Sequence, residues 1–242
     1  RQYAQKYESR YGSLKLLGMS QAVPLESVYT AVRFLDDLSI RQFESIEALE
    51  QAYRQSQNRR FQTRTAGGRD GITVANNNQY LTVLGGSGAG KSTFLRKIGL
   101  EALKAKEGGF KHCCIPVLLE LKRFNSGEID LIKLIAEEFH NFGFPPSQKF
   151  VTKALEQGKL LVLLDGLDEV SKKFLNAVIE SVQNFVSKYE KNRFVASCEM
   201  STILTEARQL FWLLEIGRRG SSNSCLLTKT LRLNFENDSM MY

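Results

Sequence analysis

A glycine-rich segment holds the residue types of this chain that are best suited to chemistry. It reads GGSGAGKST over residues 85–93, and its frame, Gly-x4-Gly-Lys-Ser, is the pattern of a phosphate-binding loop. Glycines permit backbone angles closed to other residues, so successive N–H groups can turn inward toward phosphate oxygens. We therefore expect a nucleotide site made by Gly85, Gly86, Ser87, Gly88, Ala89, Gly90, Lys91, Ser92 and Thr93.

Two side chains of this loop have distinct predicted roles. Lys91 would bring a positive charge to the β- and γ-phosphates, which makes it a catalytic candidate as well as a binding residue. Ser92 would place its hydroxyl on Mg²⁺, and a helix beginning there would point its positive dipole end at the anion. The flanks fit this motif, because residues 80–84 are apolar and β-branched like a strand and residues 93–106 carry apolar side chains at helical spacing.

A second stretch, LLVLLDGLDE over residues 160–169, ends an apolar run in acids. An acid at the carboxyl end of a buried parallel strand lies at the crevice where open α/β sheets bind ligands. Asp165 is thus expected to hold Mg²⁺ opposite Ser92. Glu169 is the preferred candidate to orient or deprotonate the attacking water, and Asp168 would tune it or help to hold the metal. The alternative is an ordinary strand-to-helix turn with two N-terminal acids, which the phosphate loop makes less favoured.

The elements that would position these motifs alternate between strand and helix. Residues 114–121 and 159–164 are near-continuous apolar runs, typical of strands buried on both faces, and residues 193–198 form a further short strand. Amphipathic helices are predicted over 130–141, with Asp130 as N-cap, and over 147–157 and 171–189. This order predicts an α/β fold, a three-layer P-loop NTPase sandwich with a parallel sheet, preceded by a small helical segment.

The rest of the chain differs in composition. Apolar residues recur at helical spacing from Val28 to Leu35, and a second amphipathic stretch covers residues 39–53. A polar, glycine- and arginine-rich stretch follows. The end of the chain carries one amphipathic stretch over residues 201–214, and a lid packed on the sheet is the alternative to a degenerate end. We divide the chain into a helical N-terminal segment (1–53), a linker (54–78), the NTPase domain (79–198) and a divergent or degenerate tail (199–242).

Composition narrows the class of protein. The chain has 242 residues and a net charge of +7, but no helix carries a continuous basic stripe with interleaved aromatics, so a solvated basic face is favoured over nucleic-acid binding. Its four cysteines lack C-x-x-C spacing and a histidine at ligand spacing, which favours buried free thiols in a reducing, cytoplasmic compartment over zinc. No apolar run approaches the ~20 residues that span a bilayer, so no membrane partner is expected.

Together, residues 85–93 and the LLVLLDGLDEV stretch over residues 160–170 resemble the NACHT family, a branch of the signal-transducing P-loop ATPases with numerous domains (STAND). The DG-x-DE continuation of the Walker B strand is the mark of that family. The resemblance covers residues 80–198, and residues 25–29 resemble what precedes the domain in bacterial, especially cyanobacterial, members, of which this chain looks like a truncated example.

The resemblance implies a switch. Bound ATP or GTP with Mg²⁺ would set whether helical domains stay closed or release to oligomerise, in innate immunity or bacterial defence. It also implies protein partners, which we expect to bind the N-terminal helices, and self-association.

One position departs from the family pattern. Where the family supplies an arginine that can reach the γ-phosphate, the sensor 1 position, this chain has Glu199. A carboxylate there would repel a polyanion or turn away from it, so we expect nucleotide binding with weak hydrolysis. A non-catalytic interaction module with nucleotide as a structural ligand remains the alternative. An ordinary GTPase is less favoured, because no Asn-Lys-x-Asp guanine motif occurs.

Overall fold

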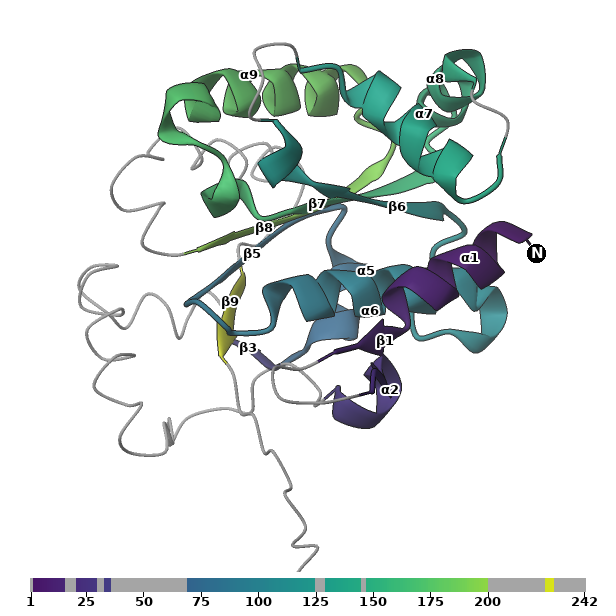
Figure 1. Cartoon of the computed structure of the whole chain (residues 1–242), viewed down its shortest axis with the longest axis vertical. Helices are drawn as coiled ribbons and strands as arrows, with labels where there is room; N and C mark the ends of the chain where they lie inside the picture. Colours follow the sequence, from purple (N-terminus) through teal and green to yellow (C-terminus); the bar gives the residue numbers. More distant parts are fainter. Residues whose placement is uncertain are drawn as a thin grey trace, which may run out of the picture.

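A seven-stranded sheet forms the middle layer of the protein (Figure 1). The computed structural model describes residues 2–15, 21–29, 33–35, 69–124, 129–144, 147–199 and 225–228. The strand order is β4-β3-β9-β5-β8-β7-β6. The strands are β3 (Arg33–Leu35), β4 (Arg69–Asp70), β5 (Tyr80–Gly85), β6 (Ile115–Glu120), β7 (Leu160–Asp165), β8 (Arg193–Glu199) and β9 (Cys225–Thr228).

Five neighbouring strands of this sheet run parallel, from β9 through β5, β8 and β7 to β6. In register, Gly85 lies opposite Glu199, and Glu120 lies opposite Asp165. The strands that carry the two predicted motifs therefore end at one carboxyl edge, with β8 between them. The predicted parallel α/β sheet is confirmed, and β3 adds an antiparallel side to it through β9 and β4.

Helices cover both faces of the sheet (Figure 1). One face carries α7 (Leu131–Asn141), α8 (Gln148–Glu156) and α9 (Lys172–Lys188); the other carries α1 (Gln2–Tyr11), α5 (Gly71–Asn77) and α6 (Lys91–Leu103). Every residue of β7 is buried, as expected for an apolar strand between two helical layers. Asp130 caps α7 as predicted, its Oδ1 accepting a 3.0 Å hydrogen bond from the amide of Lys133.

Short elements join these layers. In the part of the chain that the structure describes, three 3₁₀ turns lie at the ends of longer elements: η1 (Ala105–Glu107), η2 (Leu121–Arg123) after β6, and η3 (Leu167–Glu169) after β7. Near the N-terminus, β1 (Ser13–Leu14) pairs with β2 (Val23–Pro24), and α2 (Leu25–Val28) follows.

The first helix is packed into the same body as the sheet. Tyr3, Tyr7 and Tyr11, spaced four apart on α1, are all buried. The Tyr3 hydroxyl donates a hydrogen bond of 2.5 Å to the Pro116 carbonyl of β6. Tyr7 lies directly against Gly99 of α6, where an added Cβ would meet its hydroxyl oxygen. A larger residue at position 99 would therefore displace α1.

Two predicted segments differ from the structure. The helical spacing from Val28 to Leu35 is wrong at its C-terminal end, because Arg33–Leu35 is a strand that pairs with β4 and β9. A short apolar run fits a helix face or a strand equally well, and long-range pairing decides between them. The end of the predicted linker contains β4 and α5, whose N-cap, Asp70, accepts from the Thr73 amide at 2.9 Å.

The C-terminal stretch contributes to the sheet through β9, which pairs with β5 and β3. The helices predicted over residues 39–53 and 201–214 lie outside the described residues. The division of the chain into four parts remains a prediction.

Candidate functional site

The phosphate loop turns directly from β5 into α6. Gly88 and Gly90 have φ angles of +68° and +87°, in the left-handed region that strains residues with a side chain. The Phe94 amide donates to the Gly90 carbonyl at 2.9 Å, so regular helical bonding begins at the last loop glycine. The loop thereby presents its backbone at the N-terminus of a 13-residue helix, where both amides and dipole favour an anion.

Lys91 closes back over this loop. Its Nζ donates hydrogen bonds of 3.0 Å to the carbonyl oxygens of both Gly85 and Gly86. Phosphate oxygens are charged acceptors and bind an ammonium more strongly than neutral carbonyls do. The ammonium can therefore exchange these carbonyls for phosphate oxygens while its stem stays in place.

The predicted metal residues, Ser92 and Asp165, lie in contact although they are far apart in sequence. The Ser92 hydroxyl donates to Asp165 Oδ1 at 3.0 Å. A hydroxyl and a carboxylate are oxygen donors that suit Mg²⁺, which takes its other ligands from phosphates and water. Within the part of the chain that the structure describes, no group of three or more His, Cys, Asp or Glu side chains could hold a metal. The donor set thus fits a Mg²⁺ shared with a bound nucleotide.

Ser197 is a candidate site residue that the sequence analysis did not identify. Its hydroxyl donates to the same Asp165 Oδ1 at 2.6 Å and accepts from the Gly166 amide at 2.8 Å. The side chain is fully buried in β8, between the strands that carry the loop and Asp165. It therefore fixes the orientation of the carboxylate. The available signal was a single hydroxyl near the end of an otherwise apolar strand.

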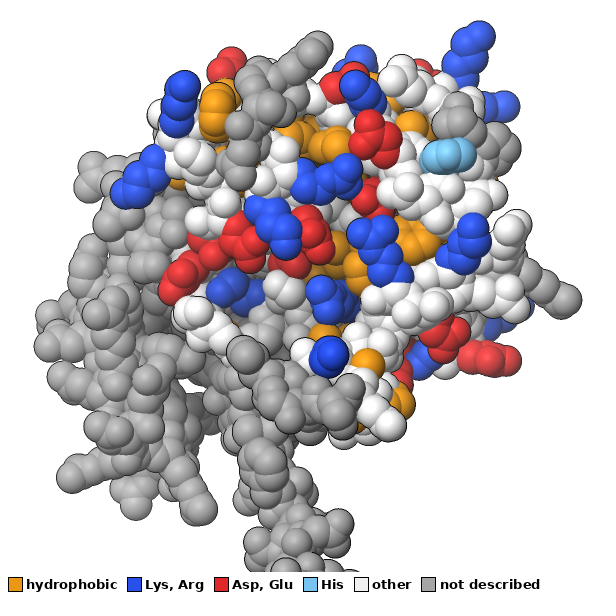
Figure 2. Space-filling model, in the orientation of Figure 1, with side chains coloured by type: hydrophobic (Ala, Val, Ile, Leu, Met, Phe, Trp, Pro, Cys, Tyr) orange, Lys and Arg blue, Asp and Glu red, His pale blue; other side chains and the backbone are white. Residues whose placement is uncertain are grey.

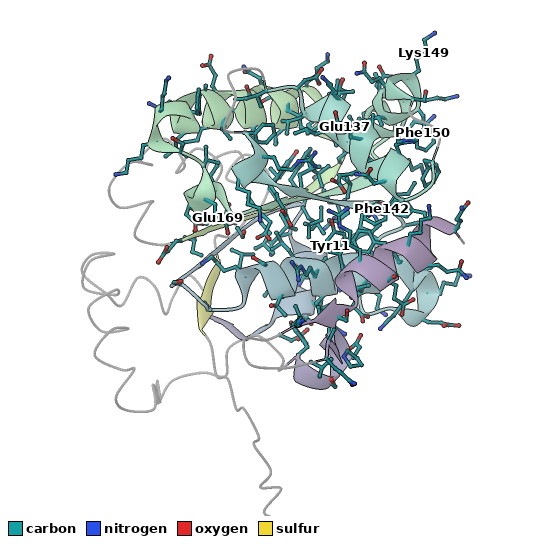
Figure 3. All side chains as sticks on the ribbon, viewed as in Figure 1. Tyr11, Glu137, Phe142, Lys149, Phe150 and Glu169 are labelled. Atoms are coloured by element: carbon teal, nitrogen blue, oxygen red, sulfur yellow. The ribbon has the colours of Figure 1, made fainter. Side chains whose placement is uncertain are left out.

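The two acids that follow β7 are held differently. Asp168 Oδ1 accepts a 2.7 Å hydrogen bond from the Glu199 amide, which ties η3 to the end of β8. Glu169 is exposed, and Figure 3 shows it at the end of the molecule where β5 leads into α6. Gly166 makes the turn possible with a φ of +76°. The exposed carboxylate of Glu169 agrees with its predicted role as the base, which itself remains a prediction.

Glu199 ends β8 opposite Gly85, beside the loop. Its neighbour Cys198 is buried, and burial together with the charge of Asp168 raises the pKa of the Cys198 thiol to about 12, against the opposing charge of Lys91. The thiol is therefore neutral at ordinary pH. Around Cys198, at the end of β8, acidic side chains outnumber basic ones.

A further acid and base lie at the end of β6. Lys122 Nζ and Glu120 Oε2 form an ion pair of 3.0 Å. The hydrogen bond to Glu120 raises the pKa of Lys122, and the charges of Glu169 and Asp165 add to this effect. Figure 2 shows basic and acidic side chains interspersed over the middle of the face in view.

The cysteines follow the sequence prediction only in part. Cys198 is buried, but Cys113 is exposed and Cys114 is half-buried. All three are free thiols, while the side chain of Cys225 lies outside the described residues. Among the residues that the structure describes, no helix is both long and apolar enough to cross a bilayer.

Comparison with family models agrees with the two motifs. A family model described as "NACHT domain" matches residues 79–228, and this match confirms the resemblance that the two motifs predicted. No curated protein matches the sequence. The chain is also similar to a solved structure titled "Structure of C. elegans PCH-2", with 15% identity and a TM-score of 0.33 over 83% of this chain and 46% of that one. The chain thus spans less than half of the length of that protein.

Proposed function

Because the chain belongs to the NACHT domain family, we propose that it is a nucleotide-dependent switch that binds ATP, or GTP, together with Mg²⁺. The observation that carries this proposal is the 3.0 Å contact between Ser92 of the phosphate loop and Asp165 at the end of β7. A hydroxyl from the start of α6 and a carboxylate from the end of β7 lie in contact, as a phosphate-bound cation requires.

Each group has a defined task in this proposal. The loop amides from Gly86 to Ser92 hold phosphate oxygens, and Lys91 moves its ammonium from the loop carbonyls to the β- and γ-phosphates. Ser92 and Asp165 hold Mg²⁺, which would neutralise charge on the phosphates when bound. Ser197 keeps the Asp165 carboxylate oriented.

Hydrolysis is slow in this proposal. Glu169 orients or deprotonates the attacking water, and Asp168 keeps η3 in place through the Glu199 amide. In the transition state, negative charge is spread over the γ-phosphoryl oxygens and develops on the leaving oxygen, and a carboxylate at the end of β8 does not stabilise it. The bound triphosphate therefore persists, which suits a switch better than a fast ATPase.

The regulatory role extends to partners. The nucleotide state would control protein partners at the N-terminal helices and self-association of the chain, in signalling or bacterial defence in the cytoplasm. The supporting observation is that α1 and α2 both contact α6, the helix that begins at the phosphate loop. Glu26 of α2 pairs with Lys97 and Lys104 of α6.

The second candidate is a non-catalytic module in which nucleotide is a structural ligand. The specific observation in its favour is Glu199 at the position where the family has an arginine. Both candidates require nucleotide binding, and turnover alone separates them.

The experiment that tests the proposal is to denature freshly purified protein and identify any nucleotide that is released, with Lys91→Ala as the control. We expect a stoichiometric nucleoside di- or triphosphate from the wild type. The variant should release about a hundredfold less under matched conditions, because a charged hydrogen-bonding group to the phosphates is lost. A wild type that is empty and also fails to bind added ATP with Mg²⁺ would contradict both candidates.

A further inference from the structure

The turn that follows β7 is bonded to the end of β8 at two points. The Gly166 amide donates to Ser197 Oγ at 2.8 Å. The Glu199 amide donates to Asp168 Oδ1 at 2.7 Å. Within the turn, the Glu169 amide donates to the Gly166 carbonyl at 3.0 Å. The main chain of the turn is therefore fixed relative to both strands.

The side chain of Glu169 lies over Gly166, in space that a larger residue would fill. A Cβ placed on Gly166 would lie 3.0 Å from Glu169 Cδ and 3.2 Å from both Cγ and Oε1. Glu169 is exposed, whereas Gly166 is buried and directly follows Asp165, the predicted Mg²⁺ ligand. The carboxylate of Glu169 therefore lies against the turn, over the residue next to Asp165.

Gly166 could not carry a side chain without moving this carboxylate. Non-bonded carbon atoms make favourable contacts at about 3.5–4.0 Å, so a Cβ at 3.0 Å from Cδ would overlap the carboxyl group. The turn is held by its hydrogen bonds, while the exposed side chain of Glu169 can rotate. The carboxylate would therefore yield and the turn would stay.

A substitution at Gly166 also has an effect on the backbone. The φ angle of Gly166 is +76°, a left-handed conformation that strains an alanine. Asparagine adopts this conformation more readily than alanine, yet it has the same Cβ. Alanine and asparagine thus differ in backbone strain, but both fill the space that the Glu169 side chain occupies.

We propose that Gly166 is a positioning residue for hydrolysis: because it lacks a side chain, it leaves the space in which the Glu169 carboxylate is held next to Asp165. The carboxylate is in place before a nucleotide binds, and a methyl group at position 166 is enough to displace it. This inference rests on the proposed function, in which Glu169 orients or deprotonates the attacking water.

The test measures two quantities on the full chain: the rate of ATP cleavage under single-turnover conditions, and the affinity for ATP with Mg²⁺ by calorimetry. In Gly166→Ala and in Gly166→Asn we expect cleavage to slow about tenfold, because a displaced base loses part of a contribution of roughly a hundredfold or more. The affinity should stay within about twofold of the wild type, since the loop amides and Lys91 are unchanged.

Gly143→Ala is the matched control. Gly143 has a φ of +93°, and the atoms nearest to an added Cβ belong to the side chains of Gln2 and Lys6, at 3.3 Å. Figure 3 shows its neighbour Phe142 well apart from Glu169. This variant has the same kind of backbone strain, and its cleavage rate should not change. An equal loss of rate in the control would assign the effect to strain and overturn the inference.

A double variant shows whether Gly166 acts through Glu169. Glu169→Gln alone should slow cleavage about a hundredfold, because the base is lost. Adding Gly166→Ala to it should slow cleavage by less than about twofold more, since no base is left to displace. A further tenfold loss in the double variant would show that Gly166 acts through another group, and the inference would be wrong.

The remaining outcomes separate this inference from the function on which it rests. Wild-type rates in both Gly166 variants, or slow cleavage in Gly166→Ala alone, would overturn the inference, because the Cβ would then have no effect of its own. An affinity that falls as much as the rate would also overturn it, while nucleotide binding would stand. A wild type that binds ATP without cleaving it would overturn the inference and favour the non-catalytic module. A wild type that does not bind ATP would overturn the proposed function as well.

Discussion

The two ends of the parallel sheet use polar side chains in opposite ways. At the amino end of β8, Arg193 donates to the carbonyls of Ala75, Asn76 and Asn78 at 2.6–3.0 Å, which closes the C-terminal turn of α5. The Asn192 side chain donates to two carbonyls and accepts from the Leu160 amide. The side chains of Arg193 and Asn192 bond to main-chain groups that take no part in the candidate site, so they stabilise the fold.

At the carboxyl end the partners are exchangeable. Lys91 rests on two loop carbonyls, and the Ser92 hydroxyl donates to Asp165 Oδ1. Each of these bonds can be traded for a bond to phosphate or metal. The comparison teaches that a polar group belongs to the fold or to the site according to whether its partner can be replaced.

Among the substitutions that test this comparison, Asn192→Ala should have the largest effect. The Leu160 amide would lose its side-chain acceptor, whereas the carbonyls of Leu155 and Tyr189 each keep one amide donor. We expect a loss of roughly 3 kcal/mol in the free energy of unfolding, measured in urea, because a buried donor is left unpaired. Nucleotide affinity of the folded variant should not change. A stable variant with weakened nucleotide binding would reverse the assignment of the two ends.

At the other end, Asp165→Asn should act on the ligand and not on the fold. The amide oxygen can still accept from Ser92 and Ser197, so the free energy of unfolding should change by less than about 1 kcal/mol. Loss of the negative charge should weaken the effect of Mg²⁺ on ATP affinity about tenfold. Titration of ATP with Mg²⁺ and with EDTA measures this. An undiminished Mg²⁺ effect would mean that another group holds the ion.

Glu199→Arg tests the effect of a single side chain at the carboxyl end of β8. Its amide, which donates to Asp168, is unaffected by the side chain, so η3 should stay in place. A guanidinium at the end of β8 should raise the rate of ATP hydrolysis several-fold, through stabilisation of charge on the γ-phosphoryl oxygens. Phosphate release under single-turnover conditions is the measurement, with Lys149→Arg as the control. No gain over the parent would remove Glu199 as the cause of slow hydrolysis.

The smallest expected effect belongs to a cluster at neither end, on α6. Burial pushes the pKa of Glu101 up, but the Gly109 amide and the ammonium groups of Lys104 and Lys97 outweigh it and hold the pKa at about 2. Because this lies below the unfolded value of about 4.3, the carboxylate stabilises the fold at neutral pH, and this stability is lost as the pH falls from about 5 to 2.

We expect on the order of 1 kcal/mol from this cluster, since Lys104 is half-exposed and screening reduces the gain. Urea unfolding across this pH range, for the wild type and for Glu101→Gln, measures it. A variant that loses stability with acid as steeply as the wild type would assign the slope to other carboxylates.

The sequence predicted what local chemistry determines. The apolar runs before Asp165 and before the phosphate loop are strands, and Ser92 lies in contact with Asp165. The helix α5 could also have been found, because Asp70 three residues before Thr73 is a capping pattern within a polar stretch. The four-residue spacing of Tyr3, Tyr7 and Tyr11 was a similar signal of a buried helix face.

Other features depend on contacts between distant residues. Ser197 acquires its role only because β8 inserts between β5 and β7, and a lone serine in an apolar strand does not reveal that order. Arg33–Leu35 becomes a strand only because β9 and β4 supply partners on both sides. None of these pairings has a local signature that periodicity could detect.

The tyrosine face of α1 has a practical consequence for where this domain can be cut. The family match begins at residue 79, yet Tyr3, Tyr7 and Tyr11 fill space beside Phe139, Phe142 and Gly99. A fragment that starts at the matched boundary would bare an aromatic groove along α6 and α7, and such surfaces promote aggregation. The region that sequence profiles identify is therefore smaller than the unit that must be expressed to obtain a soluble protein.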